Sequence, residues 1–206
     1  MNALIGRKLG MTRVFDAEGT HVPVTVIEAG PCPVILVAGD RVQLGFDAKK
    51  AKRTTRALAG HVKPAGLETA PRVLRSFPLA GEAPKAGDRI TVSIFAAGER
   101  VKVAGVTKGR GFQGVVHRHH FGGGPETHGN TRHRKPGSIA PGTDPSRIIK
   151  GKRMPGHMGA RHFTEMGLRV VKIDAERNLL FVRGAVPGPM NGLVTVRKQG
   201  GKSRHD

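Results

Sequence analysis

Short segments in which apolar and polar residues alternate recur along most of this chain. In 89–95, for example, Ile90, Val92 and Ile94 alternate with polar side chains. A period of two predicts a strand with one buried face, and the abundance of Val, Ile and Phe favours the same structure. The predicted strands are 12–15, 22–28, 34–38, 41–46, 73–77, 89–95, 99–106, 168–173, 179–183 and 193–197. Many short strands predict an all-β fold, either a barrel or a sandwich.

Turn-forming residues separate several of these strands. Gly39-Asp40 is typical of a two-residue hairpin loop with glycine in the first turn position, and 174–178 predicts a second turn. The segment 47–66 shows no period-two pattern and carries six Lys or Arg residues. We interpret it as a basic excursion from the fold with room for one helical turn.

A central segment of different composition interrupts the predicted strands. Between Lys108 and Arg161, eleven Lys or Arg stand against two acidic residues, which gives a formal charge of +9, and only eleven of these 54 residues are apolar. Such a segment buries too little apolar surface to offset its conformational entropy, so alone it should be extended and mobile. We therefore predict a β-barrel domain formed by 1–106 and 163–206, and an inserted arm, 107–162.

The overall charge indicates the kind of partner. The chain has 206 residues, a formal net charge of +20 and a pI near 11.4. This excess predicts an anionic partner, for which nucleic acid is the first candidate. No stretch approaches the ~18 apolar residues of a membrane-spanning helix, and the first residues lack the apolar region of a signal peptide. We therefore expect a cytoplasmic protein without a membrane partner.

The candidate catalytic residues and metal ligands do not form recognisable sites. Cys32 is the single cysteine, which we expect as a half-buried thiol in the turn after 22–28. The glycines of 109–114 match a dinucleotide fingerprint, but no helix start and no acid about 20 residues on follow them. The arm has six histidines but no His-Glu-x-x-His motif and almost no acids to orient a metal site. We predict no enzyme activity, no metal site and no small-molecule substrate.

The arm instead has the composition of an RNA-binding segment. Its cations are interleaved with Gly, Pro and Met, which suits a backbone that lies close to a folded RNA while Lys and Arg contact phosphates. Neutral imidazoles can stack on bases or contact phosphate and 2′-hydroxyl groups. The predicted RNA-binding residues are Lys108, Arg110, Arg118, His119, His120, His128, Arg132, His133, Arg134, Lys135, Arg147, Lys150, Lys152, Arg153, His157 and Arg161.

Several motifs, in order over nearly the whole chain, give it a family resemblance. The first is Leu4-Ile5-Gly6-Arg7-Lys8-Leu9-Gly10-Met11-Thr12. The others are 22–26, 29–32, 105–112, 121–125, 127–129, 136–139, 150–154, 156–159, 178–180 and 182–188. In combination these motifs are highly specific, and the chain resembles bacterial large-subunit ribosomal protein three (the L-three family).

The resemblance implies a structure and a function. It implies a six-stranded barrel of the kind found in translation factors, with a long loop that extends through the rRNA toward the peptidyl-transferase centre. It also implies a structural constituent of the large subunit that binds the 3′ domain of its rRNA, acts early in assembly and neighbours proteins of the L-fourteen and L-nineteen families. No enzyme activity is implied, and no cofactor beyond Mg²⁺ as an rRNA counterion.

The resemblance also places the loop tip, at 140–148. The residues expected near the peptidyl-transferase centre are Pro141, Gly142, Thr143, Asp144 and Pro145, and Lys150, Lys152 and Arg153 are expected to brace them. Thr143 occupies the position of a glutamine that is methylated in some members, so this modification does not transfer. His119 or His120 replaces an aromatic residue common in the family. An acid beside rRNA is unusual, and we expect Asp144 to cap a turn in which Arg147 screens its charge.

Two other functions are compatible with parts of this pattern. An RNA-acting enzyme could use the arm's histidines, but a general base needs an orienting partner, and Glu126 and Asp144 lie eighteen residues apart. A non-specific nucleic-acid binder or chaperone would need no more than the charge of +20. Activity assays on RNA would test the first alternative, and co-sedimentation with large subunits through high salt would test the second.

Overall fold

The computed structural model describes residues 1–79 and 83–199, which form two compact units. The first unit consists of Met1–Thr107 and His162–Asp206, and the second is Lys108–Arg161. The second unit contains all of the arm except its outermost residue at each end. The insertion begins after one barrel strand and ends at the start of another.

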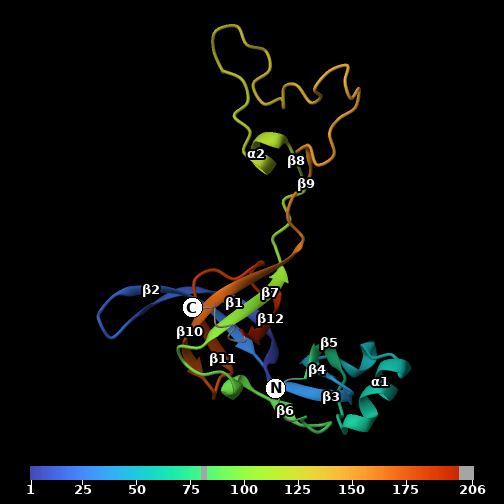
Figure 1. Ribbon diagram of the computed structural model, residues 1–206. Helices are drawn as coiled ribbons and strands as arrows, with labels where there is room; N and C mark the ends of the chain where they lie inside the picture. Colours follow the sequence, from blue (N-terminus) through green and yellow to red (C-terminus); the bar gives the residue numbers. More distant parts are fainter. Residues whose placement is uncertain (80–82, 200–206) are drawn as a thin grey trace, which may run out of the picture. The chain divides into compact units, whose positions relative to one another are not determined.

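Six antiparallel strands of the first unit close into a barrel (Figure 1). They pair in the order β1-β12-β7-β10-β11-β2. Their bounds are β1 (Ala3–Phe15), β2 (His21–Ala29), β7 (Arg100–Val106), β10 (His162–Asp174), β11 (Leu179–Arg183) and β12 (Leu193–Lys198). The first and last strands close the barrel, from Ala3 opposite Arg197 to Arg7 opposite Leu193. The predicted all-β fold class and the six-stranded barrel are confirmed.

The barrel is filled by the inward-facing residues of these strands. In β7, Val101 and Val103 are fully buried, whereas Lys102 between them is only partly buried. At one point of β1 there is no room for a side chain: a Cβ atom on Gly6 would lie 2.6 Å from the carbonyl oxygen of Glu28. The alternation therefore produces a core rich in Val and Ile, with a glycine at a point of β1 where β2 leaves no room for a side chain.

A second sheet packs against the barrel in the same unit and was not foreseen from the sequence. Its strands follow the order β5-β4-β3-β6, with bounds β3 (Cys32–Ala38), β4 (Arg41–Ala48), β5 (Pro71–Pro78) and β6 (Arg89–Ile90). The predicted hairpin at Gly39-Asp40 is confirmed, since Ala38 pairs with Arg41 and Gly39 has φ +56°. The predicted turn between β10 and β11 is also confirmed.

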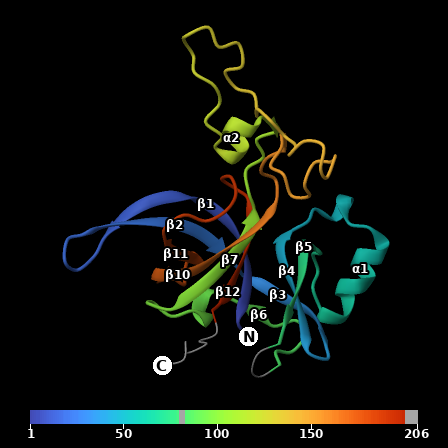
Figure 2. The same cartoon turned by 45° about the horizontal axis from the view of Figure 1, so that its top comes forward.

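The second sheet is covered on both faces. Val34 belongs to the core shared with the barrel, whereas its neighbour Ile35 packs with Val62 and Ala70 in a separate apolar cluster. Val62 lies in a short helix, α1 (Arg56–Val62), flanked by the 3-10 helices η1 (Ala51–Arg53) and η2 (Lys63–Ala65). Figures 1 and 2 show α1 on the side of this sheet that faces away from the barrel. The predicted basic excursion is thus a small helical layer.

Three local predictions are corrected. The predicted strand at 89–95 ends at Ile90 and continues as the 3-10 helix η3 (Val92–Ile94). Residues three apart share a face of a 3-10 helix, so Val92 and Phe95 both enter the core. The first strand begins at Ala3, well before the predicted 12–15. Cys32 starts β3 and is fully buried rather than half-buried, with its thiol 3.3 Å from the carbonyl oxygen of Ile5.

Candidate nucleic-acid interface

The second unit, Lys108–Arg161, contains little regular structure. Its elements are β8 (Phe112–Gln113), α2 (Val115–His119) and β9 (Gly156–His157), and the remaining residues form turns and extended segments. Val115 is its one buried apolar side chain. The arm is therefore organised by hydrogen bonds and glycine turns rather than by an apolar core.

Most of the predicted RNA-binding side chains are exposed on this unit. With eleven cations and two acids, the arm cannot neutralise most of its positive charge internally. The exposed predicted residues are Lys108, Arg110, His120, His128, Arg132, His133, Arg134, Lys135, Arg147, Lys150, Lys152, Arg153, His157 and Arg161. They form a cationic surface that is accessible to a polyanion.

The arm's outgoing and returning segments pair near its base, a region we call the neck (108–120 and 154–160). Phe112 pairs with His157, and Gln113 pairs with Gly156. Beside them, the amide of Arg110 donates to Met158 (2.9 Å), and the amide of Met158 donates to Gly111 (2.9 Å). A short two-stranded ladder thus joins segments that are more than forty residues apart.

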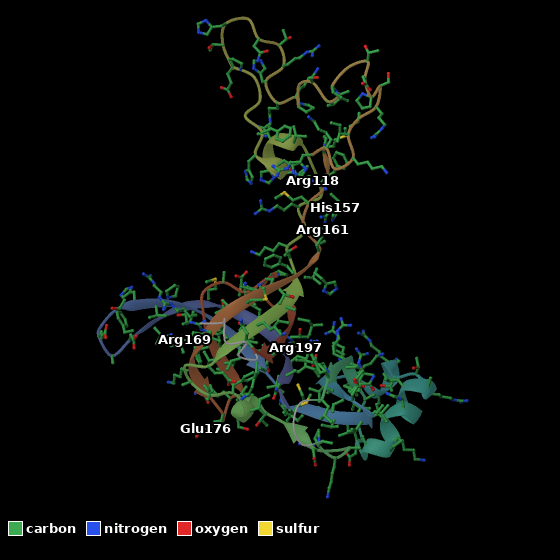
Figure 3. The ribbon with its side chains drawn as sticks, viewed as in Figure 1. Arg118, His157, Arg161, Arg169, Glu176 and Arg197 are labelled. Carbon is green, nitrogen blue, oxygen red and sulfur yellow. The ribbon has the colours of Figure 1, made fainter. Side chains whose placement is uncertain are left out.

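Two of the predicted RNA-binding residues contact the backbone of the neck through their side chains. Arg118 Nη1 donates a 2.6 Å hydrogen bond to the carbonyl oxygen of Met154, and His119 Nε2 lies 3.1 Å from the same oxygen. Both side chains are half-buried, unlike the other fourteen. The structure thus places them on the arm's own backbone. Figure 3 shows the Arg118 side chain beside the strand that carries His157.

A glycine-rich turn forms the next part of the arm. The amide of Gly124 donates to the carbonyl of His133 (3.0 Å), and Asn130 Nδ2 donates to Pro125 (2.8 Å). A Cβ atom on Gly123, which has φ +71°, would overlap the carbonyl oxygen of His133. The turn borders a cavity of about 530 Å³ whose cationic lining residues are Arg132 and Lys135. The sequence indicated these glycines and cations but not the folding of 122–124 onto 130–134.

The predicted tip is fully exposed. Residues Pro141, Gly142, Thr143, Asp144 and Pro145 all present their side chains or backbone to solvent, as do Lys150, Lys152 and Arg153 behind them. Asp144 and Arg147 are both exposed, and among the described residues no hydrogen bond or ion pair joins them. The expected screening of Asp144 by Arg147 therefore involves no direct contact between the two side chains in this structure.

Several exposed apolar residues of the arm were not among the predicted site residues. Phe112 is 77% exposed, and Ile149 and Ile148 are 57% and 40% exposed. An exposed aromatic ring in a cationic surface can stack on a base. The position of Phe112 between glycines, Gly111-Phe112-Gln113-Gly114, was the signal in the sequence that could have indicated it.

Residues 1–79 and 83–199 contain no group of three or more His, Cys, Asp or Glu side chains placed to hold a metal ion. None of their helices has the length and apolar character needed to cross a membrane. Burial raises the pKa of the Cys32 thiol to about 11, so this thiol is a poor nucleophile at neutral pH.

A closed antiparallel barrel that carries a long cationic insertion defines a class, the basic all-β proteins whose exposed charge fits a nucleic acid. Comparison with known families identifies the particular family: residues 74–179 match the family Ribosomal protein L3. The chain belongs to this family, whose members are structural, non-catalytic proteins of the large ribosomal subunit.

Similar proteins extend the match to nearly the full chain. The chain is 48% identical to large ribosomal subunit protein uL3 of Herpetosiphon aurantiacus, over 96% of each chain. It is 45% identical to the uL3 protein of a Synechococcus strain, over 98% of each chain. It is 47% identical to that of Dehalococcoides mccartyi, over 97% of this chain and 99% of the relative. Barrel, second sheet and arm are all covered.

Proposed function

We propose that this protein binds large-subunit rRNA through the exposed cations of its arm. The observation that carries the proposal is the charge of the second unit, +9 over 54 residues, combined with the exposure of nearly all of its Lys and Arg side chains. The proposed contacts are the fourteen exposed residues named above, with phosphates as the main partners of Lys and Arg. Phe112 joins them as a stacking residue.

Family membership supports a more specific role. The protein binds the 3′ domain of the large-subunit rRNA, enters the subunit early in assembly, and extends residues 141–145 toward the peptidyl-transferase centre. The exposure of these five residues supports this role, because a loop tip that contacts RNA must keep its surface accessible instead of packing against the rest of the chain. In this proposal the domain of 1–106 and 163–206 anchors the protein, and 107–162 penetrates the rRNA.

The proposal includes neighbours and conditions. Proteins of the L-fourteen and L-nineteen families contact the globular domain within cytoplasmic ribosomes. Three exposed methionines of this domain, Met11, Met166 and Met190, offer large apolar side chains for such contacts. The protein needs no cofactor, and Mg²⁺ acts only as a counterion of the rRNA.

A tethered cleavage probe tests the position of the tip. Thr143→Cys provides an exposed thiol for an iron chelate that generates hydroxyl radicals, and native Cys32 is fully buried and so escapes labelling. In assembled large subunits, cleavage at peptidyl-transferase nucleotides is expected. A probe at Glu18→Cys, on the exposed turn between β1 and β2, is the matched control and should cleave elsewhere. The same cleavage pattern from both positions, or none from Thr143→Cys, would contradict the proposed tip position.

A further inference from the structure

Arg118 differs from the other cations of the arm. Its guanidinium is half-buried and donates a 2.6 Å hydrogen bond to the carbonyl oxygen of Met154, 36 residues away. Arg134, in contrast, is exposed, so its donors face solvent in the free protein. The Arg118 guanidinium instead lies against the chain's own backbone.

Gly156 provides an independent observation. A Cβ atom at this position would lie 2.5 Å from Arg118 Nη1 and 3.0 Å from Arg118 Cζ. The guanidinium therefore occupies the space that a side chain at 156 would fill. Gly156 pairs with Gln113 in the two-stranded ladder, so Arg118, which comes from α2, contacts the returning strand at the ladder itself.

These contacts determine how the two segments of the neck are held. The ladder contains only two paired positions, and a ladder this short is weak without further support. Arg118 adds a charge-assisted hydrogen bond between α2 and the returning segment, and such bonds are stronger than neutral ones. His119 Nε2, 3.1 Å from the same oxygen, lies at the same junction.

We propose that Arg118 is a positioning residue: it fixes the neck through Met154 and Gly156 and thereby orients the exposed cations of the arm, and it is not itself a phosphate contact. The part of this inference that concerns orientation toward RNA rests on the proposed function, whereas the fixing of the neck concerns the free protein. In the free protein, loss of this hydrogen bond should increase the population of molecules with a locally open neck by about 10- to 100-fold.

Hydrogen exchange of the full-length free protein tests the structural part. The amides of Arg110 and Met158 donate across the neck, so Arg118→Gln should increase their exchange rates by about 10- to 100-fold. Gly156→Ala keeps the charge but forces the guanidinium to shift from its place beside the ladder, so it should raise the same two exchange rates, by less than Arg118→Gln does. Arg134→Gln is the matched control and should leave both amides unchanged. Unchanged exchange in both Arg118→Gln and Gly156→Ala would overturn the proposal.

The salt dependence of rRNA binding tests the functional part. Arg134→Gln removes a phosphate contact and should flatten the slope of log K against log salt by about 0.7–0.9. Arg118→Gln should lower affinity at every salt concentration without changing the slope, and Gly156→Ala should behave alike. If Arg118→Gln flattens the slope as Arg134→Gln does while Gly156→Ala binds normally, Arg118 is a phosphate contact and the proposal is wrong. If the wild-type protein fails to bind rRNA, the proposed function fails, whereas the exchange result still tests the neck.

Discussion

Arg7 and Asp47 form an ion pair between the barrel and the second sheet, with Arg7 Nη2 2.7 Å from Asp47 Oδ2. Arg7 lies in β1 and Asp47 in β4, forty residues further along. Asp47 has φ +61°, a left-handed conformation that Asp tolerates better than most residues. The pair thus joins two sheets whose relative placement the strand pattern leaves undefined.

We predict that Arg7 and Asp47 are energetically coupled. A double-mutant cycle with Arg7→Ala and Asp47→Asn should give a coupling energy of about 0.5–1 kcal/mol, because both side chains are about 30% exposed and water screens the pair. Urea unfolding at low and high salt measures it, and the coupling should shrink as salt rises. Arg72, 3.6 Å from the same carboxylate and 69% exposed, is the control and should couple more weakly. Equal coupling for the two arginines would contradict the assignment of Arg7 as the main partner.

Lys8 should contribute to stability through its buried ammonium. Lys8 is 8% exposed, and its Nζ donates to the carbonyl oxygens of Val186 (2.8 Å) and Gly188 (3.3 Å). Lys8→Met leaves these acceptors without their donor and should lower the free energy of unfolding by about 1–3 kcal/mol. Urea denaturation measures this change, and the exposed Lys85→Met should change stability by less than about 0.5 kcal/mol. Similar values for the two variants would show that the hydrogen bonds of Lys8 contribute nothing.

Cys32 should make stability depend on pH in the alkaline range. Burial raises the pKa of its thiol from 9.0 to about 11, so the folded state favours the protonated thiol. The resulting stabilisation is fully present below pH 9 and is lost as pH rises from 9 through 11. Stability relative to Cys32→Ala should therefore fall over this range. Thiol labelling at pH 8 should be slow in the native protein and fast in urea. Rapid labelling of the native protein would contradict the burial of Cys32.

The clean alternation of strands such as β7 and β12 predicted an all-β fold, either a barrel or a sandwich, and the family resemblance predicted the six-stranded barrel. The sequence did not predict the division of the strands between two sheets, because Val34 and Ile35 are adjacent apolar residues that enter different cores. The strand prediction at 89–95 failed because alternation would bury Ile90, Val92 and Ile94. The 3-10 helix instead buries Val92 and Phe95 and leaves Ile94 only partly buried.

The arm, too, could be predicted only in part from the sequence. Its charge and glycine content are visible there, and these properties predicted an exposed cationic segment. The roles of Arg118 and Gly156 were not visible in the sequence, because they arise from a contact between two residues that are 38 positions apart. Composition alone gives Arg118 and Arg134 the same role, whereas the structure places one on the backbone of the arm and exposes the other.

The salt dependence of rRNA binding tests the central claim most directly, namely that the exposed cations of the arm contact phosphates. Lys150, Lys152 and Arg153 lie behind the tip and are all exposed. Affinity for large-subunit rRNA should be measured over about 50–200 mM salt for the wild type and for the variant with all three changed to Gln. We predict a slope of log K against log salt that is flatter by about two to three in the variant. An unchanged slope would place these residues away from the RNA and contradict the account.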